Sequence, residues 1–374
     1  MNELVIWAHS ECRSTMSLYR EVKRQAGVPV TIALWKYGES DDVRLSREKT
    51  GQCAGEYSDL NLMPVGEDLG NGRALLAAHS GEGAVHVFCV YQVSPVWRQL
   101  IKEAKASGAR VVVYGEAPCE MCVGVKAWLK RLYYRFVLPH KIGWVAKYVD
   151  RFLCQSGELG IDRLLRMGWR KEQVVPFGYA SDVSYEWEVG EKSWSGREDG
   201  TLRVLHTGIE TPYRDVATLL KAAKLLKGNG ISVEVVRTHG GVPLYELERL
   251  CKWADVFVAC GLCEPWGMRV NDAIHAGLPV MVSSGMGAKM IVEQCGCGSV
   301  YKAGDAKALA DALLRFAKDR AFADRCCAGV AKAHSAWLPE SKAQEFLELC
   351  HSANKSVGEV TQPLDDMPTK VLSY

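Results

Sequence analysis

Short apolar runs alternate with helix-like segments in two separate series along the chain, and this alternation restricts the fold more than any other feature. Strands rich in valine that are joined by helices predict parallel βαβ units with both faces of the sheet covered. Residues 36–83 are polar and rich in glycine, and no element is predicted there. The strands predicted for the first series are LVIWAH (4–9), VTIALW (30–35), AVHVFCVY (84–91), ARVVVYG (109–115) and DRFLCQS (150–156).

A change in composition separates the two series. QVVPFGYASD (173–182) gives a strand and a Pro-Phe-Gly turn, and a polar, aromatic stretch follows to about Gly200. Because 374 residues exceed what one hydrophobic core usually organises, the sequence predicts two doubly wound α/β domains, residues 1–180 and 181–338. The strands predicted for the second domain are LRVLHTG (202–208), ISVEVVRTHGG (231–241), DVFVAC (255–260) and PVMVSS (279–284).

Bulk charge and hydropathy exclude several classes of protein. The chain has 46 basic and 44 acidic residues, so a net charge of +2 gives no overall attraction to nucleic acid or anionic membranes. The N-terminus MNELVIWAHSE lacks the long apolar region of a secretory signal, and no run is long enough to span a bilayer. These features favour a cytoplasmic protein.

Fourteen cysteines raise the question of disulfides or a metal site. Two Cys-x-x-Cys pairs occur, Cys119/Cys122 and Cys260/Cys263, and both fall near the ends of predicted strands. Zinc sites usually combine such pairs over a short spacer, whereas these pairs lie more than a hundred residues apart. The interpretation is therefore free, buried thiols and no metal site.

The loop after the predicted strand DVFVAC carries the strongest candidate site. Ligands in open α/β sheets bind beyond the carboxyl ends of the strands, and a helix start near Gly267 offers free N–H groups to a phosphate. Pro265 stiffens this loop, and Gly267 lets an oxyanion approach the backbone. Glu264 and Asp272 suit the hydroxyl groups on either side of a diphosphate, which predicts a nucleoside diphosphate sugar. Alternatively, Glu264 is a helix-start carboxylate and Asp272 a solvated polar residue.

The same stretch resembles the E-x7-E region of retaining glycosyltransferases of family 4, which have the GT-B fold. In the pattern E-P-x-G-x-x-x-x-E-A-x-x-x-G-x-P-V, this chain supplies Glu264, Pro265, Gly267, Asp272, Ala273, Gly277, Pro279 and Val280. The resemblance extends over about residues 149–340. It implies two Rossmann-like domains facing each other across a cleft, with a final helix at about 339–352 returning to the first domain and a flexible tail at 353–374.

The resemblance also implies an activity. It predicts retaining transfer of a hexose from a nucleoside diphosphate sugar to a glycan or glycolipid, in the biosynthesis of cell-surface polysaccharide or lipopolysaccharide. Glu264 would contact the donor sugar and Asp272 the ribose, while the backbone from Trp266 to Met268 would contact sugar and phosphate. Asp-x-Asp does not occur in the sequence, so neither a metal ion nor another cofactor is expected.

Two departures from the family pattern leave alternatives open. Ile209 follows Gly208 where an arginine is usual, and Arg214 stands where a lysine is usual. Arg214 and the helix start at Gly267 are therefore predicted to bind the diphosphate, or Arg214 is a solvated residue at a helix start. Asp272 is one methylene shorter than the usual glutamate. Ile209 and Asp272 favour the alternative of a non-catalytic nucleotide-sugar-binding scaffold, and a sugar-nucleotide epimerase of the same fold is a further alternative.

The acceptor side is predicted at the strand ends of the first domain. Glu116 could orient or deprotonate an acceptor hydroxyl, or it is a loop carboxylate or a helix cap. His9 is either a functional residue or a structural one, and Arg13 is a candidate to bind a phosphate.

Residues 126–147, KAWLKRLYYRFVLPHKIGWVAK, form what we call the basic aromatic segment. Six basic residues interleave with five aromatic ones in this segment, which contains no acidic residue. A helix of this composition is typical of proteins that bind anionic membrane surfaces, which predicts peripheral membrane contact on the cytoplasmic face and no nucleic-acid partner. The alternative is an ordinary helix with its aromatic side chains in the core.

Overall fold

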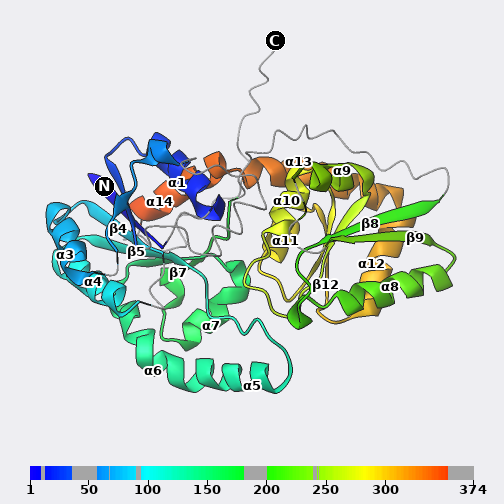
Figure 1. Cartoon of the computed structure of the whole chain (residues 1–374), viewed down its shortest axis with the longest axis horizontal. Coiled ribbons are helices and arrows are strands. Elements are labelled where there is room, and N and C mark those ends of the chain that lie inside the picture. The colour runs from blue at the N-terminus through cyan, green and yellow to red at the C-terminus, as the bar shows by residue number, and fades with distance from the viewer. Residues whose placement is uncertain are drawn as a thin grey trace, which may run out of the picture.

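The structure is a computed structural model that describes residues 1–9, 13–35, 57–66, 68–89, 94–180, 200–238, 242 and 244–352. It contains two α/β domains side by side, each built on one parallel sheet (Figure 1). The fold class predicted from the alternation of strands and helices is therefore confirmed. None of the described helices combines the length and the apolar character needed to cross a bilayer.

The N-terminal domain contains a seven-stranded sheet in the order β3-β2-β1-β4-β5-β6-β7. The pairings of neighbouring strands are parallel throughout. The strands are β1 (Glu3–Ala8), β2 (Val30–Leu34), β3 (Met63–Pro64), β4 (Ala84–Phe88), β5 (Arg110–Gly115), β6 (Arg151–Cys154) and β7 (Val174–Pro176).

Helices cover both faces of this sheet, as the apolar character of its strands on both sides requires. Helix α4 (Pro95–Ala106) illustrates the local determinants: Ser94 caps its first turn by accepting the Trp97 N–H at 3.2 Å, and Pro95 occupies its first position. The other regular helices are α1 (Arg13–Gln25), α3 (Leu69–Ala78), α5 (Gly124–Leu132), α6 (Leu138–Ile142) and α7 (Ile161–Arg166).

The C-terminal domain contains a five-stranded parallel sheet in the order β12-β11-β10-β8-β9. Its strands are β8 (Thr201–Thr207), β9 (Ser232–Thr238), β10 (Val256–Ala259), β11 (Val280–Ser283) and β12 (Gly298–Tyr301). Its helices are α8 (Val216–Gly228), α9 (Leu244–Trp253), α10 (Arg269–His275), α11 (Lys289–Cys295), α12 (Ala306–Lys318) and α13 (Arg320–Ala336).

The last described helix, α14 (Pro339–His351), lies on the N-terminal domain next to α1 (Figure 1). Phe346 of this helix belongs to the same buried cluster as β1, β2 and β4. Two arginines of the N-terminal sheet bind its carboxyl end: Arg110 donates to the His351 carbonyl at 2.6 Å and Arg151 to the Ser352 carbonyl at 2.9 Å. Cations at this end satisfy the free carbonyls of the last helical turn and its partial negative charge.

The structure adds elements that the sequence patterns did not predict. Within residues 36–83 it contains the 3-10 turn η1 (Ser58–Leu60), β3 and α3, and the 17-residue α13 was also missed. The predicted domain boundary near residue 181 and the predicted tail at 353–374 lie outside the described residues.

Candidate functional site

Glu264 lies in the loop between β10 and α10, at the carboxyl edge of the C-terminal sheet. Its N–H donates to the Gly285 carbonyl at 2.9 Å, and it forms an isolated parallel bridge with Met286. These bonds fix the loop to the one that follows β11. The Glu264 side chain is buried. Carboxylates are seldom fully buried unless a partner offsets their charge.

Arg269, at the first position of α10, is one of those partners. Its Nη2 donates to Glu264 Oε2 at 2.8 Å and to the Cys260 carbonyl at 2.7 Å, and its Nη1 donates to the Thr207 carbonyl at 3.0 Å. One buried guanidinium therefore joins the ends of β8 and β10 to Glu264. Sequence reasoning missed Arg269; the available signal was a single cation between the two predicted carboxylates, Glu264 and Asp272.

Arg214 approaches the same carboxylate from the loop after β8. Its Nη2 lies 3.5 Å from Glu264 Oε1, and its Nη1 donates to the Ile209 carbonyl at 3.1 Å. Between the two arginines lies Gly208, with φ +119°; a Cβ atom there would stand 3.1 Å from Arg269 Nη1 and 3.2 Å from Arg214 Nη1. The absent side chain at Gly208 thus leaves room for both guanidinium groups.

Three charged side chains and a histidine meet at this sheet edge. Two guanidinium groups face one carboxylate, and the buried His206 is neutral because burial and the Arg269 charge lower its pKa to about 4. The Nε atoms of Arg214 and Arg269 are buried and have no hydrogen-bond partner among the described residues. The site therefore brings two guanidinium groups to one carboxylate, which suits an anionic ligand.

Residues 265–268 connect Glu264 to α10. The helix begins at Arg269 rather than near Gly267, because Gly267 has a φ of +107° that no α-helix contains. A Cβ atom at Gly267 would stand 2.3 Å from Met286 Cε, so the missing side chain makes room for this methionine. Met268 is the N-cap residue of α10.

Trp266 and Asp272 occupy different environments. The Trp266 indole is buried, donates to Asn271 Oδ1 at 2.8 Å, and lies 5.2 Å from the Trp337 ring, so its side chain is part of the core. Asp272 is half-buried in the first turn of α10, and its N–H donates to the Met268 carbonyl at 3.1 Å. The predicted sugar and ribose contacts of these residues remain predictions.

The N-terminal domain contributes Glu116, which lies just after β5. Its Oε1 accepts the Tyr179 hydroxyl at 3.0 Å, and the Tyr179 carbonyl accepts the Asn271 side-chain amide of α10 at 3.1 Å. Burial raises the pKa of Glu116; the Tyr179 bond opposes this shift, and the charge of Glu264 adds to it. Two predicted carboxylates from different domains therefore lie close enough to interact.

The other predicted acceptor residues lie at the end of β1. The His9 ring packs edge-on against Trp35 with 5.3 Å between ring centroids. Arg13 is the first residue of α1, and its side chain lies outside the described part of the structure.

The two Cys-x-x-Cys pairs contribute one residue each to a cluster between the domains. Cys119 Sγ lies 2.9 Å from Cys263 Sγ, and Cys263 Sγ lies 2.8 Å from Glu120 Oε2. The long spacer between the pairs in the sequence does not separate them in the fold, because Cys119 and Cys263 lie in the loops after β5 and β10 and are in contact. Among the described residues, Cys119, Glu120 and Cys263 are a group whose ligand atoms are close enough to hold a metal ion. The twelve described cysteines are thiols, not disulfides.

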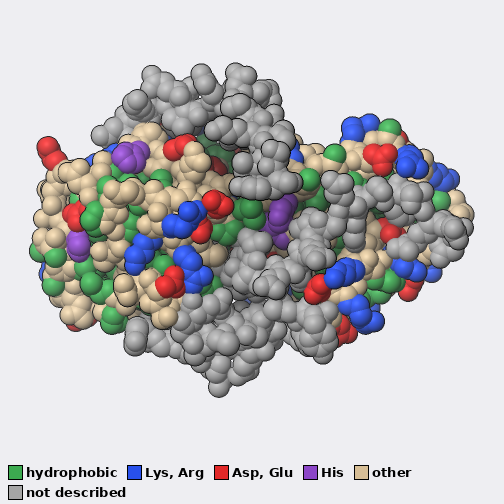
Figure 2. All heavy atoms as spheres, turned by 90° about the horizontal axis from the view of Figure 1, so that it is seen from above, with side chains coloured by type: hydrophobic (Ala, Val, Ile, Leu, Met, Phe, Trp, Pro, Cys, Tyr) green, Lys and Arg blue, Asp and Glu red, His purple; other side chains and the backbone are tan. Residues whose placement is uncertain are grey.

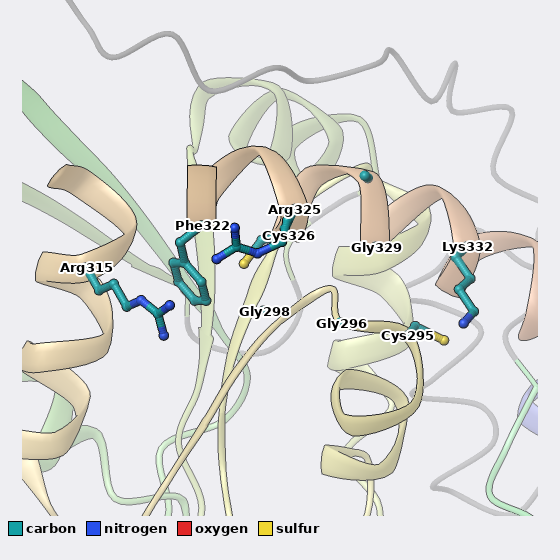
Figure 3. A pocket seen from close by; sticks show the side chains of 10 residues that line it. Cys295, Gly296, Gly298, Arg315, Phe322, Arg325, Cys326, Gly329 and Lys332 are labelled. Atoms are coloured by element: carbon teal, nitrogen blue, oxygen red, sulfur yellow. The ribbon is translucent and has the colours of Figure 1, made fainter. Parts of the chain in front are cut away.

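An open hollow on the C-terminal domain lies apart from these residues. It is formed by α11, α12, α13 and the start of β12, and its lining includes Arg315, Phe322, Arg325, Cys326 and Lys332 (Figure 3). None of the predicted site residues lines it.

The basic aromatic segment is helical but not continuous. It runs through α5, a π-helical turn at Tyr133–Val137, α6 and a 3-10 turn at Gly143–Tyr148, along the lower edge of the N-terminal domain (Figure 1). Trp128 and Phe136 are each 57% exposed, and Trp144 is 37% exposed. The alternative that places these aromatic side chains in the core is therefore wrong.

Comparisons with known proteins agree with this architecture. Residues 232–331 match the family model of the glycosyl transferases group 1. The chain is 28% identical over 134 residues to the D-inositol 3-phosphate glycosyltransferase of Nocardioides sp. (strain ATCC BAA-499 / JS614). That match covers 36% of this chain and 29% of the relative's length.

Solved structures share the fold over nearly the whole chain. Anabaena HepE, in complex with UDP and glucose, superposes with a TM-score of 0.58 at 12% identity and covers 94% of this chain and 100% of its own. The lipopolysaccharide outer core galactosyltransferase WaaB superposes with a TM-score of 0.59 at 9% identity, covering 95% of this chain and 100% of its own. At such low identity these likenesses show the fold alone, and that fold is GT-B.

Proposed function

We propose that this chain, a GT-B protein with a glycosyl transferases group 1 region at residues 232–331, is a glycosyltransferase that uses a nucleoside diphosphate sugar. The observation that carries the proposal is the arrangement of Glu264, Arg214 and Arg269 around Gly208 at the carboxyl edge of the C-terminal sheet. The matched relative is itself named a glycosyltransferase, which supports the same activity.

The finer proposal is hexose transfer with retention of the anomeric configuration. The leaving group of such a reaction is a nucleoside diphosphate, whose negative charge grows as the bond to the sugar breaks. We propose that Arg214 stabilises this charge through donors that are fixed before the reaction. Arg269 acts through Glu264: it holds the carboxylate that would accept hydrogen bonds from the sugar hydroxyls. Because two arginines supply the positive charge, we propose that transfer requires no metal ion, so activity is expected to persist in EDTA.

Glu116 is proposed to act on the acceptor. A carboxylate with a raised pKa is a better proton acceptor than an ordinary one, and Glu116 faces Glu264 from the other domain. We propose that it orients the acceptor hydroxyl and takes its proton, while Asp272 binds the ribose of the donor.

The acceptor is proposed to be a glycan or a glycolipid of the cell surface, such as a polysaccharide or lipopolysaccharide precursor. The structural likeness to WaaB, named as a galactosyltransferase of the lipopolysaccharide outer core, is compatible with this class. The exposed basic aromatic segment supports an acceptor that is held at a membrane, because it joins cations to exposed aromatic rings.

A panel of UDP, GDP, ADP and CMP sugars tests the donor site by thermal shift. A ligand at about 100 times its dissociation constant adds about 2.7 kcal/mol to the stability, which is an easily measured shift. One sugar nucleotide is expected to stabilise the wild type and to lose much of its effect in Glu264→Gln. Glu293→Gln is the matched control, because Glu293 forms an exposed ion pair with Lys289 on α11.

Turnover distinguishes the proposal from its rivals. With a radiolabelled donor, transfer to an acceptor and release of the free nucleoside diphosphate support a transferase. Donor binding without turnover would favour the nucleotide-sugar-binding scaffold, which Ile209 and Asp272 make the second candidate. Conversion of the donor sugar without an acceptor would favour an epimerase.

A further inference from the structure

A group of sulfur and charged atoms joins the two domains immediately beside Glu264. Cys119 belongs to the loop after β5 and Cys263 to the loop after β10, and their sulfur atoms are 2.9 Å apart. Arg163 of α7 donates to Glu120 Oε2 at 3.0 Å and to the Pro118 carbonyl at 2.8 Å, and its Nη2 lies 3.5 Å from Cys263 Sγ. The proposed transfer reaction uses none of these groups.

The surroundings of Cys263 favour its thiolate. The hydrogen bond from the Cys119 thiol lowers the pKa of Cys263, and Arg163 lowers it further, whereas burial and the hydrogen bond to the Glu120 carboxylate raise it. The same bond raises the pKa of Cys119, which keeps its proton. The cluster is then electrically balanced, because Arg163 and Arg131, whose Nε is 3.6 Å from Glu120, face one carboxylate and one thiolate.

A metal ion fits this cluster less well than a dithiol does. The guanidinium of Arg163 already lies against two of the three ligand atoms, where it would repel a cation. A structural zinc site also takes four protein ligands, whereas this group offers three.

We propose that Cys119 and Cys263 are an oxidation site, at which a small two-electron oxidant such as a peroxide forms a reversible disulfide between the two domains. The sulfur atoms need to approach by about 0.9 Å to reach the usual S–S bond length of about 2.05 Å. Cys119 is partly exposed, which gives a small oxidant access to the pair.

The step balances with hydrogen peroxide as the oxidant. The Cys263 thiolate attacks one peroxide oxygen, the O–O bond breaks, and a sulfenic acid and hydroxide form. The Cys119 sulfur then attacks the Cys263 sulfur, the S–O bond breaks, and its hydroxyl group leaves as water with the Cys119 proton. Both sulfur atoms are oxidised, and the peroxide is reduced to water and hydroxide.

The bond would tie the loop that carries Glu264 to the N-terminal domain. Enzymes that bind a donor between two domains open and close during turnover, so a covalent link across the junction should stop them. This consequence rests on the proposed function, whereas formation of the disulfide does not.

The test is to treat the full chain with equimolar hydrogen peroxide, block free thiols with N-ethylmaleimide and map the unreduced peptides by mass spectrometry. A peptide that links Cys119 to Cys263 is expected in the wild type and in Cys122→Ser, and its loss is expected in Cys263→Ser. At pH 7 the linkage should form about tenfold faster than oxidation of Cys327, a partly exposed thiol on α13.

The pH dependence tests the role of Arg163. The rate of linkage should reach half its maximum at a lower pH in the wild type than in Arg163→Gln, whose folding is checked by circular dichroism. A Cys119–Cys122 disulfide as the main product, separate oxidation of the two cysteines, or co-purified zinc that protects the pair would each overturn the proposal.

Donor turnover gives the final readout. It should fall on oxidation and recover with dithiothreitol in the wild type and in Cys122→Ser. If the disulfide forms but no preparation transfers sugar, the proposed function fails and the oxidation site stands.

Discussion

Arg269 shows how much one buried side chain can contribute to both fold and site. Its three oxygen partners lie at the end of β8, just after β10 and on Glu264, so its removal would leave a buried carboxylate without its main partner. Breaking a buried ion pair from one side typically destabilises a protein by about 3–5 kcal/mol.

We therefore expect Arg269→Met to lower the free energy of unfolding by about 3 kcal/mol or more. Urea unfolding followed by circular dichroism measures the change. Arg320→Met is the control, because Arg320 forms an exposed ion pair with Asp324 and should cost at most about 1 kcal/mol. Equal losses in the two variants would contradict the structural role of Arg269.

Arg214 should affect turnover rather than stability. Its side chain is 22% exposed, and its Nη1 lies beside Gly208. Removing one fixed donor from a developing negative charge typically costs a factor of about 10²–10³ in kcat. Arg214→Ala is expected to lose about 10²-fold in kcat with little change in melting temperature.

The control for Arg214→Ala is Arg237→Ala, which removes a guanidinium that pairs with Glu210 on the surface. Arg214→Lys should recover part of the activity because it keeps the charge. A kcat unchanged in Arg214→Ala would remove this residue from the mechanism.

Protonation of Glu116 should cause the loss of kcat/KM at acidic pH. The Tyr179 hydroxyl lowers the pKa of this carboxyl, against the larger effect of burial. Tyr179→Phe removes that donor, so the pKa of Glu116 rises further and a smaller fraction is deprotonated at a given acidic pH. The acid limb of kcat/KM is therefore expected to move to higher pH in Tyr179→Phe, and to stay in place in the control Tyr148→Phe. An identical limb in all three proteins would argue against Glu116 as the base.

At the scale of elements, the basic aromatic segment differs from the rest of the surface. Most of the exposed large hydrophobic side chains in the described part of the chain lie in this segment or just before it, including Val125 at 73%. On the face seen from above, by contrast, basic and acidic side chains are interspersed (Figure 2). The segment combines exposed apolar side chains with basic side chains and has no acidic residue.

Vesicle sedimentation tests membrane docking by this segment. The wild type is expected to sediment with vesicles of phosphatidylcholine and phosphatidylglycerol, and not with phosphatidylcholine alone, because aromatic insertion and cationic attraction act together. Replacing Trp128 and Phe136 by serine should abolish most of the binding. The matched control replaces Ile209 and Leu225, two hydrophobic residues exposed elsewhere. Equal binding to both kinds of vesicle would contradict the electrostatic part of the proposal.

The sequence patterns located regular elements far better than they located contacts. The predicted strand 109–115 corresponds to β5 at 110–115, because a run of valines has one favourable environment, a sheet buried on both faces. Helix α3 was missed because LGNGRALLAA contains two glycines and little periodicity. The meeting of Cys119 with Cys263 depends on how two domains face each other, which no local pattern records.

For the molecule as a whole, the buried His206 should make the free energy of unfolding depend on pH below pH 6.5. Burial, with the charge of Arg269, lowers the pKa of His206 from 6.5 to about 4. Below pH 6.5 the unfolded chain therefore binds a proton that the folded chain resists, and the free energy of unfolding falls as the pH falls from 6.5 to 4. The loss from this group is about 3 kcal/mol over that range.

Urea unfolding at several pH values checks this expectation. The free energy of unfolding should fall less steeply between pH 6.5 and 4 in His206→Gln than in the wild type. His140→Gln is the control, because His140 is exposed. Parallel slopes in the wild type and His206→Gln would show that other groups control acid unfolding.

The position of α14 also determines the order in which the domains can be completed during synthesis. The strands and helices of the C-terminal domain form one continuous stretch from Thr201 to Ala336, whereas the core of the N-terminal domain includes Phe346. At about 5–20 residues per second, the ribosome needs roughly 8–32 s to proceed from residue 180 to α14. Throughout that interval the nascent N-terminal sheet has an uncovered apolar face where α14 will pack. The domain translated first is thus finished last, and this face is where a chaperone would bind the growing chain.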